Sequence, residues 1–185
     1  WFARIGPGGE ALWSMIIGSP GFDTIHSITE APDGSIYIAG TFCQNYNLLC
    51  TISVGDQTHQ SNGGADVMIA KLSAQGDVLW SKSFGSGSSD TDMWNSWYSL
   101  NQKGIVATPD GGILMSGYGC DGWNSNCMMT IAPGYSVANH NPFIVKYDQN
   151  GTVERLSTMS GAAADYLQVM VEVDDHRVLV AGNHY

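Results

Sequence analysis

Four cysteines are the residues of this chain best placed to do chemistry. They form two pairs with the same internal spacing, Cys43-x6-Cys50 and Cys120-x6-Cys127, and the second pair lies 77 residues after the first. This regularity favours two local disulfides, because zinc sites prefer closer cysteines with histidine ligands beside them. Disulfides stiffen the loops that carry them and indicate an oxidising compartment, so we expect an extracellular or cell-surface protein.

No other group of residues has the spacing of a catalytic site or a cofactor site. His59 and His140 follow the cysteine pairs at later positions, which leaves a metal site open as an alternative to the disulfides. The serines include no G-x-S-x-G elbow, and the glycine- and serine-rich residues 85–89 lack the lysine of a phosphate-binding loop. We therefore expect no catalytic residues, no bound metal and no cofactor in this segment.

The composition excludes several classes of partner. The chain has 185 residues, of which 43% are hydrophobic and only 13% are charged, and its net charge is -10. A nucleic-acid-binding protein needs a basic surface, and anionic membranes repel an acidic one. No apolar run approaches the roughly 20 residues that cross a bilayer, so we expect no membrane insertion.

A hairpin pattern recurs along the chain. Two short β-type runs joined by a glycine-containing turn occur at residues 1–14, 68–81 and 143–155. A second set of hairpins interleaves with the first, at residues 28–40, 105–117 and 170–182. Runs of this kind joined by such turns are typical of β-hairpins. The alternation predicts a repeating unit of four strands, A to D, with a period of about 75 residues.

We therefore expect an all-β fold, a β-propeller of four-stranded antiparallel blades. The propeller segment 1–185 divides into a C–D half-blade, blade one, blade two and an A–B half-blade, at residues 1–17, 24–85, 98–160 and 166–182. The B strands carry consecutive apolar residues, as in Ile36-Tyr37-Ile38 and Val178-Leu179-Val180, which predicts strands buried on both faces. A β-sandwich is the alternative, although its strands would alternate more cleanly.

Two whole blades with two complementary halves do not close a ring of the usual four to eight blades. An open stack would expose sheet edges and apolar faces. We therefore expect one of two partners: the remainder of a longer propeller, or other copies of the chain that complete the half-blades in a ring or a filament.

Residues 63–72 read GGADVMIAKL, residues 76–85 read GDVLWSKSFG, and residues 33–40 read DGSIYIAG. This pattern resembles the SBBP-type β-propeller repeat of bacterial secreted and surface proteins. The resemblance implies a propeller fold and a blade-docking role for Trp13 and Trp80, but no catalytic residues. The G-x-x-x-W turn also resembles, more weakly, that of propellers that bind pyrroloquinoline quinone, but no residues of the chain match a quinone pocket. Two features depart from the repeat. Arg155 occupies the position that Trp13 and Trp80 have in the other hairpins, so blade two is expected to pack differently at its outer edge. The paired cysteines are not part of the usual repeat.

One face of the expected propeller carries the long loops. In an antiparallel blade the B–C loops and the D–A crossings share a face, and these are the long connections here, at residues 41–65, 118–142 and 91–103. Loops on a rigid scaffold are common binding sites, and aromatic residues suit stacking on sugars or anchoring a protein. The expected binding residues are Trp94, Trp97, Tyr98, Trp123, Tyr46 and Tyr135. Alternatively, these aromatic side chains pack the cores of their own loops.

The sequence thus predicts a non-catalytic extracellular module that is structural or adhesive. It would bind a surface protein or a glycan, or assemble through its half-blades. A glycan-specific lectin that uses the long-loop face is the alternative function. An enzyme whose catalytic residues lie outside this segment is a third.

Overall fold

The structure, a computed structural model, describes residues 1–43, 49–87, 104–118, 128–138, 141–159, 166–174 and 177–183, and these residues form strands and no helix. The first eight strands are β1 (Phe2–Ile5), β2 (Ala11–Met15), β3 (Thr24–Glu30), β4 (Ile36–Phe42), β5 (Thr51–Val54), β6 (Gln57–Gln60), β7 (Asp66–Leu72) and β8 (Val78–Phe84). The following eight are β9 (Ile105–Ala107), β10 (Ile113–Tyr118), β11 (Met128–Ala132), β12 (Tyr135–Ala138), β13 (Pro142–Tyr147), β14 (Val153–Thr158), β15 (Tyr166–Asp174) and β16 (Arg177–Asn183). The all-β prediction is confirmed.

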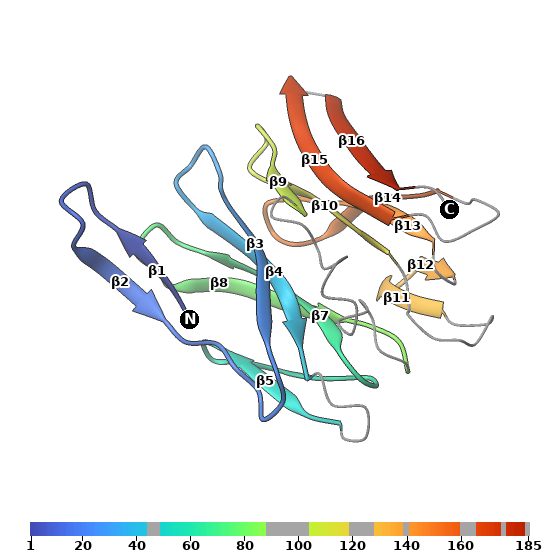
Figure 1. Cartoon of the computed structure of the whole chain (residues 1–185), viewed down its shortest axis with the longest axis horizontal. Coiled ribbons are helices and arrows are strands. Elements are labelled where there is room, and N and C mark those ends of the chain that lie inside the picture. Colours follow the sequence, from blue (N-terminus) through green and yellow to red (C-terminus); the bar gives the residue numbers. More distant parts are fainter. Residues whose placement is uncertain are drawn as a thin grey trace.

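Two four-stranded sheets form the centre of the molecule. The first sheet has the order β3-β4-β7-β8 and the second β9-β10-β13-β14, and all neighbouring strands are antiparallel. The hairpin β1–β2 precedes the first sheet and the hairpin β15–β16 follows the second. Figure 1 shows these four units side by side in chain order, with the N-terminal hairpin and β15–β16 at opposite ends. A closed propeller stays a prediction.

Five short turns at one end of the strands share one conformation. In the turn after β7, the Ser73 N–H donates to the Asp77 carbonyl and the Gly76 N–H donates to the Ser73 carbonyl. Such hairpin turns need a left-handed residue, which glycine adopts at little cost. The glycines in this position have φ between 79° and 93°: Gly9, Gly34, Gly76, Gly111 and Gly151.

The first sheet is buried on both faces. Every residue of β4 and β7 is buried. Since side chains alternate across a strand, these residues divide between two apolar clusters. Ile38, Met68 and Leu72 pack toward β1–β2, in what we name the first junction, while Tyr37 and Ile69 pack toward the second sheet, in the second junction.

The expectation of two buried faces is wrong for β16. Leu179 is 65% exposed, whereas Tyr37, at the same place in β4, is 0% exposed. Val178 and Val180 on the other face are partly buried. The pattern of β16 matches that of β4, but among the described residues no further sheet packs against the outer face of β15–β16.

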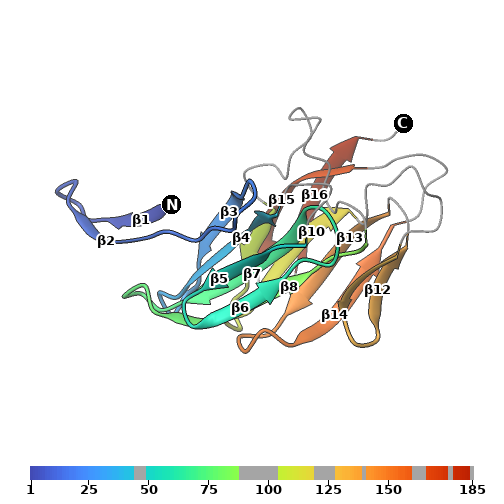
Figure 2. The same ribbon diagram turned by 90° about the horizontal axis from the view of Figure 1, so that it is seen from below.

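The two connections expected to be long loops contain hairpins of their own. Strands β5–β6 lie between β4 and β7, and β11–β12 lie between β10 and β13. One face of each hairpin is buried, with Ile52 and Val54 in the first junction and Met129 and Val137 in the second. Each hairpin therefore covers the side of its own sheet that faces the preceding unit. Figure 2 shows β5–β6 along the first sheet and β12 beside β14.

Candidate functional site

An indole and a cation join the N-terminal hairpin to the first sheet. Trp13 Nε1 donates a hydrogen bond of 3.0 Å to the carbonyl of Ala74, in the turn between β7 and β8, and Arg4 Nη1 donates to the same oxygen at 3.1 Å. Arg4 also forms an ion pair of 2.8 Å with Glu30. A carbonyl has two lone pairs, so one turn oxygen accepts both donors.

The same pair of contacts recurs between the first and second sheets. Trp80 Nε1 donates to the carbonyl of Gln149 at 3.0 Å, and Lys71 Nζ donates to it at 3.4 Å. Gln149 stands in the turn between β13 and β14, as Ala74 does between β7 and β8. Trp80 also meets Tyr37 edge-on at 5.8 Å, and the hydroxyl of Tyr37 donates to the Gly111 carbonyl of the second sheet at 2.6 Å. The two junctions are therefore held by the same pair of contacts, in which an indole N–H and a basic side chain of one unit donate to one turn carbonyl of the next unit.

Glycine in the accepting turn makes room for the indole. A Cβ atom added to Gly76 would lie 2.9 Å from the Trp13 ring, and one added to Gly151 would lie 3.0 Å from the Trp80 ring. The first distance is shorter than real Cβ contacts and the second is tighter than most of them, and a Cβ at Gly151 would also lie 2.7 Å from Lys82 Cε. Glycine is thus required at these positions for its left-handed φ and for the approach of the ring.

The register of β14 places Arg155 where the other two units have tryptophan. Arg155 lies opposite Lys146, as Trp80 lies opposite Lys71 and Trp13 opposite Arg4. Arg155 is exposed, and Lys146 forms ion pairs of 2.9 Å with Asp110 and 3.3 Å with Glu154. The outer edge of the second sheet therefore carries charge where the first sheet carries an indole.

The inserted hairpins also connect neighbouring units. An antiparallel bridge joins Gly18, after β2, to Ser53 in β5, and a second bridge joins Gly85, after β8, to Thr130 in β11. In both cases the strand that precedes the bridge is the last of its unit. Each inserted hairpin is thus hydrogen-bonded to the unit before its own. These bridges connect neighbouring units at the end of the strands where the inserted hairpins lie.

A disulfide stands at the base of the first inserted hairpin. Cys43, directly after β4, is bonded to Cys50, directly before β5, with their Cα atoms 5.8 Å apart. The predicted pairing of Cys43 with Cys50 is confirmed, and the distance lies in the usual range for disulfides. Cys120 and Cys127 lie outside the described residues.

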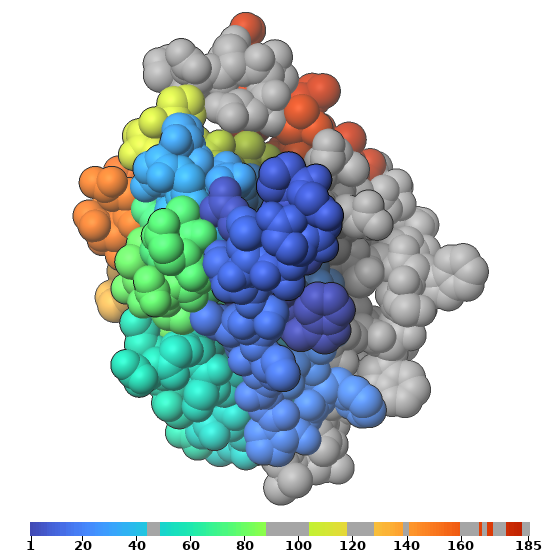
Figure 3. All heavy atoms as spheres, turned by 90° about the vertical axis from the view of Figure 1, so that its left-hand side faces the viewer, coloured from blue at the N-terminus to red at the C-terminus, as the bar shows by residue number. Residues whose placement is uncertain are grey.

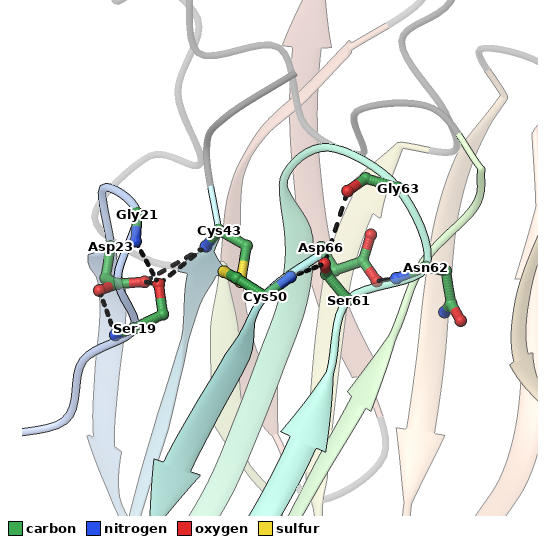
Figure 4. Close-up of a disulfide and its surroundings, with 9 residues drawn as sticks. All are labelled: Ser19, Gly21, Asp23, Cys43, Cys50, Ser61, Asn62, Gly63 and Asp66. Atoms are coloured by element: carbon green, nitrogen blue, oxygen red, sulfur yellow. Dashed lines mark hydrogen bonds between the residues drawn. A yellow bond between two sulfur atoms is a disulfide. The ribbon is translucent and has the colours of Figure 1, made fainter. Parts of the chain in front are cut away.

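Hydrogen bonds hold both ends of this disulfide, as Figure 4 shows. The Cys43 N–H donates to Ser19 Oγ and to Asp23 Oδ1, each at 3.3 Å. The Cys50 N–H donates to Ser61 Oγ at 3.1 Å. Asp23 in turn accepts from the N–H and the hydroxyl of Ser19, both at 2.6 Å. The disulfide therefore links the inserted hairpin to the crossing that enters the first sheet.

His59, which the sequence left open as a metal ligand, bonds to Ser81. Its Nε2 lies 2.6 Å from Ser81 Oγ, and that hydroxyl donates to Gln57 Oε1 at 2.8 Å. Because the serine proton points to Gln57, His59 is the donor in this contact and does not act as a base toward the serine. In the described part of the chain, no three His, Cys, Asp or Glu side chains are grouped to hold a metal ion.

Two partly buried histidines make folding depend on pH. Desolvation lowers the pKa of His26 and, together with the charge of Lys82, that of His59, from the ordinary value of 6.5. In acid the unfolded chain therefore binds more protons at these positions than the folded chain. We expect stability to fall between about pH 7.5 and about pH 5.5, as measured by urea unfolding. The double variant His26→Gln/His59→Gln should flatten this difference, and an unchanged slope would contradict the assignment.

Asp110 acts in a separate pH range. Partial burial alone would raise its pKa, but hydrogen bonds from Thr108, Lys146 and the Gly112 N–H outweigh that effect and lower the pKa to about 2. Because the folded-state pKa is lower than the ordinary value of 3.8, ionised Asp110 stabilises the fold at pH values above 3.8. This contribution is lost as the pH falls from 3.8 toward about 2. The histidine effect is therefore measurable without interference from this carboxylate.

Tyr135 is the one predicted binding aromatic that lies within the described residues. It begins β12, and its hydroxyl donates to the Glu154 carbonyl of β14 at 3.5 Å. Its ring is partly buried beside the second sheet. The other five predicted binding residues, Trp94, Trp97, Tyr98, Trp123 and Tyr46, lie outside the described residues, as does His140.

The sequence reasoning missed the cations and the crossing at the junctions. Arg4 and Lys71 share their acceptors with Trp13 and Trp80, and Asp23 orders the disulfide base. The sequence does contain a signal for these two basic residues, because Arg4 and Lys71 occupy the same position of the hairpin repeat, shortly before the turn. The acceptors are main-chain carbonyls, which no residue type identifies.

Comparison with known proteins assigns no family: no protein-family model and no curated protein matches the chain. Among the described residues, no helix is long and apolar enough to span a membrane.

Proposed function

We propose that this chain is a non-catalytic structural and adhesive module of the β-propeller type that acts outside the cell. The observation that carries the proposal is that the same pair of contacts, from an indole and a basic side chain to one turn carbonyl, occurs at two successive junctions. Trp13 and Arg4 reach the turn of the first sheet just as Trp80 and Lys71 reach the turn of the second. A stack whose neighbours always meet through the same contacts is typical of repeat architectures.

The burial of the first sheet supports a propeller over a sandwich. A sheet of a two-layer sandwich buries one face and leaves the other in water. Here β4 and β7 are buried throughout, with one apolar cluster on each side of the sheet. Radially stacked blades bury both faces of every inner sheet in this way.

The disulfide supports an extracellular location. Cys43 and Cys50 are bonded, and disulfides persist in oxidising compartments and are rare in the cytosol. The acidic net charge of -10 suits a soluble surface module rather than one that binds nucleic acid.

The outer faces of the two end hairpins support lateral packing against further sheets of the same kind. Ile5 is 57% exposed, while Leu72, its counterpart in β7, is fully buried. Leu179 at the other end is exposed while its counterpart Tyr37 is buried. Exposed apolar faces of this kind mark contact surfaces. The partner sheet belongs either to the same polypeptide or to another copy.

Light scattering over a range of micromolar concentrations tests this packing. We expect the chain to self-associate, and Leu179→Asp to shift the population toward monomer, because a charge on the outer face of β16 opposes burial. Leu79→Asp is the matched control, since Leu79 is also exposed, at 52%, but lies in β8. A monomer at every concentration, or equal effects of the two variants, would overturn lateral packing between copies.

A further inference from the structure

A cavity of about 220 Å³ lies in the first junction, next to the disulfide-linked crossing. Apolar and polar side chains line it together, and they include Trp1, Ile17, Asp23, Thr24, Thr41 and Met68. Figure 3 shows this side of the molecule, where the N-terminal segment in blue crosses the first sheet above the β5–β6 region. The cavity is thus formed by elements from both partners of the junction.

Two positions in the core beside the cavity carry smaller side chains than the corresponding positions of the second junction. Ile17 precedes the bridging Gly18, and Phe84 precedes the bridging Gly85 in the same way. Met68 lies opposite Gly40 in β4, and Phe143 lies opposite Gly117 in β10. Both phenylalanines are buried in the core of the second junction. Two aromatic rings therefore stand at the positions of the second junction where the first junction has an isoleucine and a methionine.

The polar groups of the cavity wall are held in place before any ligand arrives. Asp23 accepts hydrogen bonds from Ser19 and from the Cys43 N–H, so its carboxylate has a fixed direction. Thr41 Oγ1 lies 3.0 Å from His26 Nε2. Pre-organised polar groups lower the entropic cost of binding. The disulfide at Cys43 stiffens the same wall.

The apolar part of the wall is open to solvent at its rim. Trp1 is 85% exposed, and it lines the cavity together with the buried Ile17 and Met68. An exposed indole beside a carboxylate and two hydroxyls combines a flat apolar surface with hydrogen-bond acceptors. A sugar ring presents the complementary features, an apolar face and a rim of hydroxyl donors.

We propose that this cavity binds a single neutral sugar ring, with ring hydroxyls donating to the Asp23 carboxylate and the apolar face of the ring against Trp1 and Met68. The volume is below the roughly 300–1,000 Å³ of pockets that enclose drug-sized ligands, which limits the occupant to a small ring. The charge of Asp23 excludes acidic sugars. This assignment rests on the proposed function, since it names a ligand of the adhesive module.

Titration of the whole chain with neutral monosaccharides, followed by NMR, tests the proposal. Glucose, galactose, mannose and N-acetylglucosamine are the probes, and we expect at least one to shift the indole signal of Trp1 and the amide signals of Thr24 and Thr41. Met68→Phe fills the cavity with the side chain that the second junction carries, and it should abolish the shifts. Ile17→Phe is a second filling variant in case the first one disturbs folding, and Leu79→Phe is the exposed control that should bind as the unchanged chain does.

Three outcomes would overturn the sugar site: no shift with any of the four sugars, unchanged binding in both folded filling variants, or binding of simple alkylamines alone, which would make Asp23 a site for cations. Light scattering separates this result from the proposed function. A chain that self-associates without binding sugar overturns the cavity assignment alone. A chain that binds sugar but stays monomeric overturns only lateral packing between copies.

Discussion

Replacing Trp80 with alanine is expected to lower the free energy of unfolding by about 3 kcal/mol. The indole is half-buried against the apolar cluster of the second junction and meets Tyr37 edge-on. Truncation removes that packing and also the hydrogen bond to the Gln149 carbonyl, which contributes about 1 kcal/mol. Urea unfolding measured by circular dichroism would report the change.

Two variants divide this effect into its parts. Trp80→Phe keeps an aromatic ring and loses the N–H donor, so we expect a loss of about 1 kcal/mol. Leu79→Ala, at the neighbouring exposed position of β8, should change stability by no more than about 0.5 kcal/mol. Equal losses for Trp80→Ala and Leu79→Ala would show that the indole contributes nothing specific to the junction.

The accepting turn offers an independent check on the same contact. Gly151→Ala brings a Cβ atom against the Trp80 ring, while Gly134→Ala, with φ of 83° and no neighbour within 4 Å, tests the backbone conformation alone. A left-handed alanine costs about 1–2 kcal/mol in both variants. The excess loss in Gly151→Ala should shrink in the Trp80→Ala background, because the ring is then absent and only the flexible end of Lys82, whose Cε would lie 2.7 Å from the added Cβ, has to move.

Local patterns made much of the fold predictable. The turn glycines, the order of the hairpins and the Cys43–Cys50 pairing all depend on residues close together in sequence, so their spacing carries the information. The hairpin β5–β6 was missed although Ile52 and Val54 alternate with polar residues before a glycine turn. Four residues of alternation are too few to separate a short strand from a loop by pattern alone.

The junctions depend on contacts that the pattern does not contain. Arg4 and the Ala74 carbonyl are 70 residues apart, and a main-chain acceptor is present in every residue. The exposure of Leu179 likewise depends on what packs against β16, since its local sequence matches that of buried strands. The cavity of the first junction likewise brings together residues far apart in sequence, since Trp1 and Met68 line it together.

Removal of the disulfide in the variant Cys43→Ala/Cys50→Ala should destabilise the fold by about 2.5 kcal/mol, the loop-closure value for a ring of eight residues. Cys43 is fully buried, and its N–H anchors the crossing through Ser19 and Asp23, so the structure resists rearrangement around the lost bond. Reduction of the unaltered chain should cause at least this loss, because it would also open the second predicted pair, Cys120 and Cys127. Urea unfolding with and without reductant measures both.

The effect of the disulfide should be confined to one side of the molecule. The bridge between Gly18 and Ser53 connects β5 to the N-terminal hairpin, so release of Cys50 loosens the first junction. Hydrogen exchange should accelerate at Ser61, whose N–H donates to the Cys50 carbonyl, and leave the Met115 amide in β10 unchanged. Equal acceleration at both amides would mean that the junctions unfold as one unit. The repeated contacts would then act cooperatively along the whole stack rather than pairwise between neighbours.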